Sequence, residues 1–112
     1  MFKIFQSYNN LVTLFSEKND GPMKITDDQR NLNNRLAFLE KNNIDSNNLF
    51  VSLLKHTNNV VVVKDTNIKM FFECDGLVTN LPNTYLSLTV ADCTAVYLFD
   101  PVNKAIGLLH VG

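Results

Sequence analysis

The sequence predicts an α+β fold in which mixed β-sheets are combined with flanking helices. Two observations support this prediction. Leucines recur at helical spacing in one segment of the N-terminal half, and β-branched and aromatic residues dominate from residue 49 onward. The 112 residues are 46% hydrophobic and 19% charged, which is typical of one small globular domain with a buried core.

The first third of the chain is predicted to hold a hairpin and the helix. Residues 2–5 and 11–15 are apolar segments on either side of Asn9-Asn10, as in a β-hairpin. Thr26 and Gln29 have the spacing of a capping box, so we expect the helix to begin near Thr26. The helix should continue to about residue 42, because apolar residues recur there at helical spacing: Leu32, Leu36 and Leu39.

The rest of the chain is predicted to be mainly β-structure. Six segments have strand composition: residues 49–54, 60–63, 77–79, 85–91, 95–99 and 105–111. Pro101 takes the second position of a turn that starts at Asp100, so the last two strands should form a hairpin. Both are apolar without alternation, as in strands buried on both faces. Such strands need covering layers on each side, so we expect the chain to be the N-terminal part of a larger domain.

Charge and composition exclude several classes of partner. The formal net charge is −1 and no cluster of Lys and Arg occurs, so nucleic-acid binding is not expected. No apolar stretch is long enough to span a bilayer and the first residues do not have the pattern of a signal peptide, so we expect a cytoplasmic protein. In that reducing compartment Cys74 and Cys93 should be free thiols.

Three residues are candidate metal ligands: His56, Cys93 and His110. Two imidazoles and a thiolate with an open fourth position are typical of a catalytic zinc site, although the same ligands also accept copper. Each residue has a simpler interpretation when taken alone. Cys93 could be a small buried hydrophobe, His56 a loop residue, and His110 a hydrogen-bonded core residue.

Four further residues bear on the site. Asp92, beside Cys93, could act as a base, orient a ligand or hold substrate hydroxyls, and it could equally cap local backbone amides. Asp75 is expected to fix the turn before residues 77–79, and Cys74 to be an ordinary thiol. Arg35 could bind an anion or form a salt bridge on the helix surface.

Short motifs give the chain a family resemblance. The segments Cys74-Asp75-Gly76-Leu77-Val78-Thr79, Ala91-Asp92-Cys93 and His110-Val111-Gly112 resemble the laccase-domain family, also called multicopper polyphenol oxidases and now understood as purine nucleoside phosphorylases. The resemblance extends over about residues 15–112. It implies that His56, Cys93 and His110 fall on the metal ligands of the family. It also implies the layered α/β/β/α arrangement of the complete family domain, of which this chain would be the N-terminal part, residues 1–112.

The resemblance implies zinc-dependent phosphorolysis of adenosine, inosine, guanosine and methylthioadenosine, with adenosine deamination as a side activity. Purine nucleosides and phosphate would then be the partners. A copper-dependent polyphenol oxidase is an alternative, although multicopper oxidation needs more than the two histidines present. A non-catalytic fragment that retains the ligands is another. The chain departs from the family by having Leu54-Lys55-His56-Thr57 where Gln-Val-His-Gly is usual, and Val90 where threonine is usual.

Overall fold

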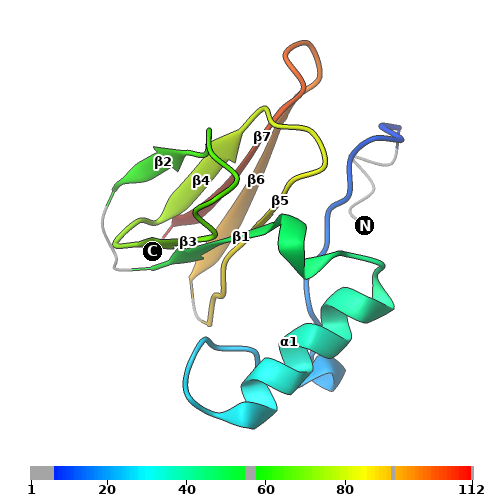
Figure 1. Ribbon diagram of the computed structural model, residues 1–112, viewed down its shortest axis with the longest axis vertical. Helices are drawn as coiled ribbons and strands as arrows, with labels where there is room; N and C mark the ends of the chain where they lie inside the picture. The colour runs from blue at the N-terminus through cyan, green and yellow to red at the C-terminus, as the bar shows by residue number, and fades with distance from the viewer. Residues whose placement is uncertain (1–6, 55–57, 92, 112) are drawn as a thin grey trace. The chain divides into compact units, whose positions relative to one another are not determined.

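The structure, a computed structural model of the chain, describes residues 7–54, 58–91 and 93–111. Over these residues it contains one α-helix and two β-sheets, which confirms the predicted α+β class (Figure 1). The chain divides into two compact units, Met1–Phe38 and Leu39–Gly112, and both sheets belong to the second. None of the helices in the described part of the chain is both long and apolar enough to cross a membrane.

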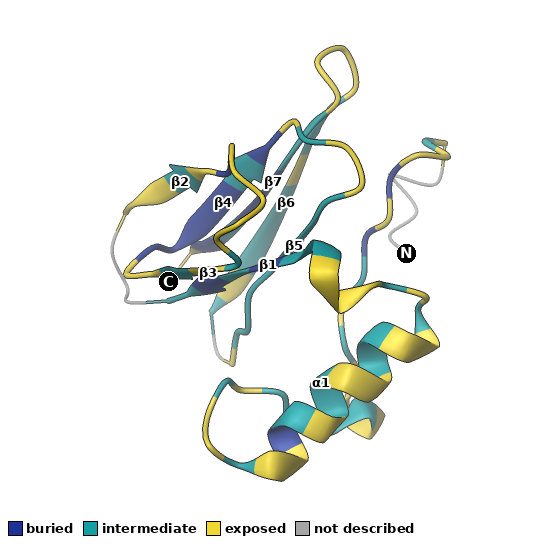
Figure 2. Ribbon diagram, viewed as in Figure 1, coloured by how far each residue is buried: buried dark blue, intermediate teal, exposed yellow. Residues whose placement is uncertain are grey.

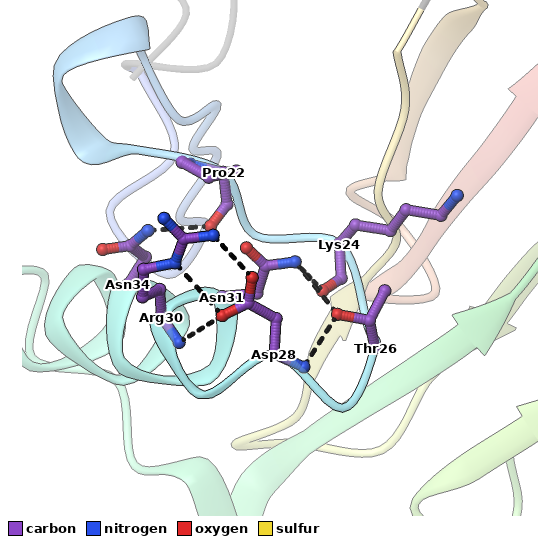
Figure 3. A network of polar contacts seen from close by, with 7 residues as sticks. All are labelled: Pro22, Lys24, Thr26, Asp28, Arg30, Asn31 and Asn34. Atoms are coloured by element: carbon purple, nitrogen blue, oxygen red, sulfur yellow. Dashed lines mark hydrogen bonds and ion pairs between the residues drawn. The ribbon is translucent and has the colours of Figure 1, made fainter.

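The helix α1 spans Gln29–Lys41, close to its predicted range, but the predicted capping residue is wrong. Oδ1 of Asp28 accepts a hydrogen bond from the Arg30 backbone N–H at 2.9 Å, so Asp28 caps the helix. The hydroxyl of Thr26 instead accepts from the Asp28 backbone N–H at 3.1 Å, within the turn that precedes the helix (Figure 3). The pKa of the Asp28 carboxyl lies below its ordinary value because the side chain and backbone of Arg30 donate to it.

Asparagine side chains hold the segment before α1 against the helix. Asn31, the buried residue of α1, donates from Nδ2 to the Lys24 carbonyl at 3.1 Å (Figure 3). Asn34 donates from Nδ2 to the Pro22 carbonyl at 2.9 Å. The predicted stripe of leucines is less buried than expected, since Leu36 is 47% exposed. Polar contacts with the preceding loop therefore contribute to the position of this helix in its unit.

Of the predicted N-terminal hairpin, the described residues contain the turn but no strand. A turn does form at Asn9-Asn10, because the Leu11 backbone N–H donates to the Tyr8 carbonyl at 3.2 Å. Residues 11–15 are not in a strand, however, and residues 2–5 lie outside the described part of the chain. An apolar pattern can favour an extended backbone, but a strand also needs a neighbour with which to form a ladder.

In the described residues, seven strands form the two sheets, and two short 3₁₀ helices lie elsewhere, at Lys18–Asp20 and Ser46–Asn48. Sheet A has the order β3-β1-β5, with both outer strands parallel to β1. Sheet B has the order β2-β4-β7-β6, with β2 parallel to β4 and the other pairs antiparallel. The strands are β1 Leu49–Leu53, β2 Val60–Val62, β3 Met70–Phe72, β4 Gly76–Thr79, β5 Tyr85–Ser87, β6 Thr94–Asp100 and β7 Ala105–Val111.

The six predicted strands are all present, and the sequence interpretation missed β3. That strand has only three residues and pairs in parallel with the distant β1, so no adjacent strand forms a hairpin with it that a local pattern could reveal. The β6–β7 hairpin is confirmed. Oδ1 of Asp100 accepts from the backbone N–H groups of Val102 and Asn103, at 3.0 and 3.3 Å, which closes the turn.

The core of the second unit packs against one face of sheet B, which we call the inner face. Directly paired residues share a face, so register places six residues there: Asp75, Leu77, Thr79, Ile106, Leu108 and His110. Leu77 joins a buried cluster with Phe50 of β1, Val63 and Cys74. Phe50 also lies near Phe71 of β3, with ring centroids 6.4 Å apart, so both sheets contribute to this core.

The opposite, outer face of sheet B has exposed apolar residues, mainly on its edge strands β2 and β6; Figure 2 shows the exposed parts of β2. Val62 on β2 and Leu98 on β6 are 54% and 48% exposed, and Val60 and Val111 are similar. The prediction that β6 and β7 are buried on both faces is therefore wrong. No residue of β6 is buried, and the buried side chains of β7, Leu108 and His110, lie on the inner face. An apolar sheet face of this kind favours association with another surface.

We expect lysine on the outer face to reduce self-association without loss of stability. The Val62→Lys and Leu98→Lys variants should each keep the free energy of unfolding within about 0.5 kcal/mol, because both side chains are already in solvent. Sedimentation velocity should show less oligomer than in the unsubstituted chain. Leu77→Lys, on the inner face, is the matched control and should unfold the protein. A chain that sediments as a monomer at all concentrations would contradict the expectation.

Gly76 permits close packing of β4 on β7. A Cβ atom at this position would lie 2.5 Å from Leu109 Cδ2 and 3.2 Å from the Leu108 carbonyl oxygen. We expect Gly76→Ala to lower the free energy of unfolding by about 1–3 kcal/mol, as overpacking does. Urea denaturation of a double-mutant cycle with Leu109→Ala tests the cause, because removal of Leu109 Cδ2 should reduce the cost. If Gly76→Ala lowers the free energy of unfolding equally with and without Leu109→Ala, the contact with Leu109 Cδ2 does not cause the loss of stability.

Candidate functional site

Two of the three candidate ligands, Cys93 and His110, lie at one end of sheet B. Strands β2, β4 and β6 begin at this end and β7 finishes there, as the parallel and antiparallel pairings require (Figure 1). We call it the His110 end. The described residues that mark it are Asn59, which precedes β2, Asp75, which precedes β4, Cys93, which precedes β6, and His110 on β7.

His110 and Asp75 form a buried pair across the β4–β7 ladder. The His110 backbone N–H donates to the Asp75 carbonyl at 2.7 Å, which extends the ladder by one residue beyond Gly76. The ring nitrogen Nδ1 lies 3.7 Å from Asp75 Oδ1, and both side chains are only 3% exposed. A carboxylate withdrawn from water is costly unless positive or donor groups face it, so the imidazole is a favourable neighbour.

Cys93 lies on the other side of His110. The pairing of Ala95 with His110 places these two residues directly opposite each other. Cys93 comes two residues before Ala95, in a bend directly before β6. Its thiol is free and partly exposed. The hairpin thus brings two of the predicted ligands to one end of the sheet although 17 positions separate them in the sequence.

His56 and Asp92 lie outside the described residues. Among the residues that are described, no group of three or more His, Cys, Asp and Glu side chains is arranged to hold a metal ion. The first described residues after His56 include Asn59, which lies at the His110 end. Asn59, three residues after His56, accepts a hydrogen bond from the Asp75 backbone N–H at 2.9 Å.

Arg35, the predicted substrate-binding residue, belongs to the first compact unit and lies on α1. Its Nη1 donates to the carbonyls of Met23 and Lys24, at 3.2 and 3.0 Å. The guanidinium therefore holds the loop before the helix by hydrogen bonds to its backbone. No carboxylate contact of Arg35 is seen in the described chain, so the surface salt bridge considered as an alternative is not its observed role.

The sequence interpretation missed the position of Asp75 relative to His110. Asp75 was expected only to fix a turn, yet its side chain is buried against the imidazole. The available signal was a carboxylate one residue before a buried strand, but only the β4–β7 register could link it to residue 110. Cys74, by contrast, is the ordinary thiol that we expected. It is 1% exposed, with its Sγ 3.2 Å from the Ser52 hydroxyl oxygen, and that hydroxyl donates to the Cys74 carbonyl.

Comparisons with known proteins agree on one family. A family model described as "Multi-copper polyphenol oxidoreductase laccase" matches residues 12–112. Among curated proteins, the purine nucleoside phosphorylase YlmD of Bacillus subtilis is 42% identical over 38 residues, which are 34% of this chain and 14% of that protein. A purine nucleoside phosphorylase of Borreliella burgdorferi is 40% identical over 57 residues, 51% of this chain and 24% of that protein.

Solved structures show the same fold. The Bacillus licheniformis hypothetical protein YfiH superposes with a TM-score of 0.69 at 29% identity, covering 75% of this chain and 34% of that one. YlmD from Geobacillus stearothermophilus gives a TM-score of 0.75 at 22% identity, covering 81% of this chain and 38% of that one. The matched region thus corresponds to little more than a third of either solved chain.

The two thiols should differ in reactivity. In the native protein, we expect a thiol reagent such as Ellman's reagent to label Cys93 quickly, because it is partly exposed, and to label Cys74 only after unfolding. The count of labelled thiols before and after addition of denaturant measures this difference. The Cys93→Ala variant should show no rapid labelling, and rapid labelling in that variant would contradict the burial of Cys74.

Proposed function

The chain belongs to the multi-copper polyphenol oxidoreductase laccase family, and from this premise we propose that it carries the metal centre of a zinc-dependent purine nucleoside phosphorylase. The observation that supports the proposal most directly is the position of Cys93, His110 and Asn59 at the same end of sheet B. Asn59 comes three residues after His56. Relatives named purine nucleoside phosphorylase indicate the reaction. The family description indicates a metal-dependent protein without identifying the metal in this chain.

The donor atoms suit zinc. His56, Cys93 and His110 would supply two nitrogens and one sulfur, with a fourth position left for a water molecule or substrate oxygen. The described part of this set agrees with the requirement, since Cys93 has a free thiol and the His110 ring has a carboxylate beside one of its nitrogens. When bound, zinc supplies a Lewis acid that stabilises negative charge on an oxygen ligand.

The proposed reaction is phosphorolysis of the N-glycosidic bond of adenosine, inosine, guanosine and methylthioadenosine, with adenosine deamination as a side activity. Purine nucleosides and phosphate are then the partners, and nucleic acid is not. Asp92 is our proposal for the group that orients the substrate or accepts a proton beside Cys93. Arg35 is our proposal for an anion-binding residue. Because its Nη1 binds two backbone carbonyls, phosphate would contact its other nitrogens.

A copper-dependent polyphenol oxidase is the alternative that the family description favours. The nitrogen and sulfur ligands would accept copper. Multicopper oxidation, however, needs several metal centres, and the sequence contains only two histidines. We therefore place phosphorolysis first. The free thiols of Cys74 and Cys93 also suit the reducing cytoplasm, where we propose that the protein acts.

Substitution of Cys93 tests the proposal. The protein should purify with stoichiometric zinc, and Cys93→Ala should remove both the zinc and the phosphate-dependent release of adenine from adenosine, because a ligand is lost. Metal analysis and chromatography of the free base are the measurements. Cys74→Ala is the matched control, since it also removes a thiol but one that lies in the core, and it should retain zinc.

Two results would contradict the proposal. One is zinc binding that is unchanged in Cys93→Ala, which would place the metal elsewhere. The other is oxidation of phenols by the copper-loaded protein without phosphorolysis, which would favour the oxidase.

A further inference from the structure

Asp75 has no role in the function proposed above, yet its carboxylate lies 3.7 Å from the ring of a candidate ligand, His110. We propose that Asp75 is a positioning residue: its carboxylate holds the His110 ring with Nδ1 toward β4, which leaves Nε2 as the nitrogen presented to the metal. The inference rests on the proposed function in assigning His110 as a ligand. It extends that function by naming a residue that orients the ligand.

The backbone fixes where the Asp75 carboxylate can lie. The Asp75 N–H donates to the Asn59 carbonyl at 2.9 Å, and the Asp75 carbonyl accepts from the His110 N–H at 2.7 Å. The residue is therefore held by the chain on both sides, between the start of β2 and the end of β7. Gly76 then allows β4 to approach Leu109 closely. With its backbone held in this way, Asp75 cannot move far from the ring without breaking the ladder.

The two flanks of His110 differ in chemistry. On the β4 side, Nδ1 lies 3.7 Å from Asp75 Oδ1, and both side chains are 3% exposed. On the β6 side, the residue directly opposite is Ala95, which has only a methyl group. The β4 flank therefore supplies a buried carboxylate, whereas the residue directly opposite on the β6 flank, the side on which Cys93 lies, has no polar group in its side chain. This asymmetry favours a single orientation of the imidazole.

The orientation matters because an imidazole ligates a metal through one nitrogen while the other carries the proton. A carboxylate near the second nitrogen stabilises the tautomer with the proton on that nitrogen and makes the ligating nitrogen more basic. The distance of 3.7 Å exceeds that of a hydrogen bond, so in this structure Asp75 acts on Nδ1 through its charge and by its position. A purely structural pair would show the same burial but would not control the ring tautomer or the metal affinity.

The Asp75→Asn variant distinguishes a positioning role of Asp75 from a purely structural one. The amide preserves shape but removes the charge, and its NH₂ group can donate to Nδ1 and so shift the ring proton to Nε2. We expect zinc affinity, measured by competition with a chelating dye, to fall by about 10–100-fold. In the zinc-free protein, ¹⁵N NMR of the ring should find the His110 proton on Nδ1 in the wild type and on Nε2 in Asp75→Asn.

Thr79→Val is the matched control. Thr79 is a buried residue of the same strand, and its hydroxyl donates to the Val63 carbonyl at 2.8 Å, far along β4 from the His110 end. This variant should lose stability in urea denaturation while keeping the wild-type zinc affinity and ring tautomer. This control therefore separates a loss of stability from a change in zinc affinity or ring tautomer.

Several outcomes would overturn the inference. A folded Asp75→Asn variant with wild-type zinc affinity and the proton still on Nδ1 would do so. If that variant does not fold, the wild-type tautomer decides, because a proton on Nε2 in the zinc-free wild type is incompatible with the inference. Zinc binding that depends on Cys93 but not on Asp75 would remove the inference and leave the proposed function intact. Absence of any zinc binding that depends on His110 would remove both.

Discussion

The register of β4 against β7 is the constraint on which the rest of the second unit depends. It pairs Leu77 with Leu108 and, one step beyond the strand, brings Asp75 opposite His110 through a 2.7 Å backbone hydrogen bond. Because side chains alternate between faces, a slip of one residue would move His110 to the outer face and Leu109 to the inner one. The core and the candidate site would then be lost together. Packing of the inner face therefore also selects the geometry of the site.

The two faces of sheet B serve different purposes. The inner face supplies Leu77 to a cluster with Phe50 and Val63, and it ends in the polar pair of Asp75 and His110. The outer face is equally apolar in sequence but remains in solvent at Val62 and Leu98. In the solved relatives the matched region is little more than a third of the chain. Exposed apolar residues of this kind favour association with another surface.

Membership of the laccase family constrains the chemistry, and the site residues refine it. The β6–β7 hairpin brings Cys93 and His110, the proposed sulfur and nitrogen donors, to one end of sheet B, and Asn59 lies at the same end. Such a donor set suits a Lewis-acid centre for group transfer better than a multicopper oxidase. The buried carboxylate of Asp75 lies beside His110, one of the proposed ligands, where it would help to orient the imidazole.

The sequence alone was sufficient to predict the α+β class, the helix near residues 29–41, the final hairpin and six of the seven strands, since all of these depend on local periodicity and turn chemistry. It also indicated Cys93 and His110 as residues that a hairpin could bring together. Only the tertiary structure showed β3, the cap at Asp28, and the partition of apolar strands into a buried and an exposed face. The contact of Asp75 with His110 belongs to the same group, because pairing between residues 35 positions apart is decided by the register and packing of the whole sheet, which no local pattern encodes.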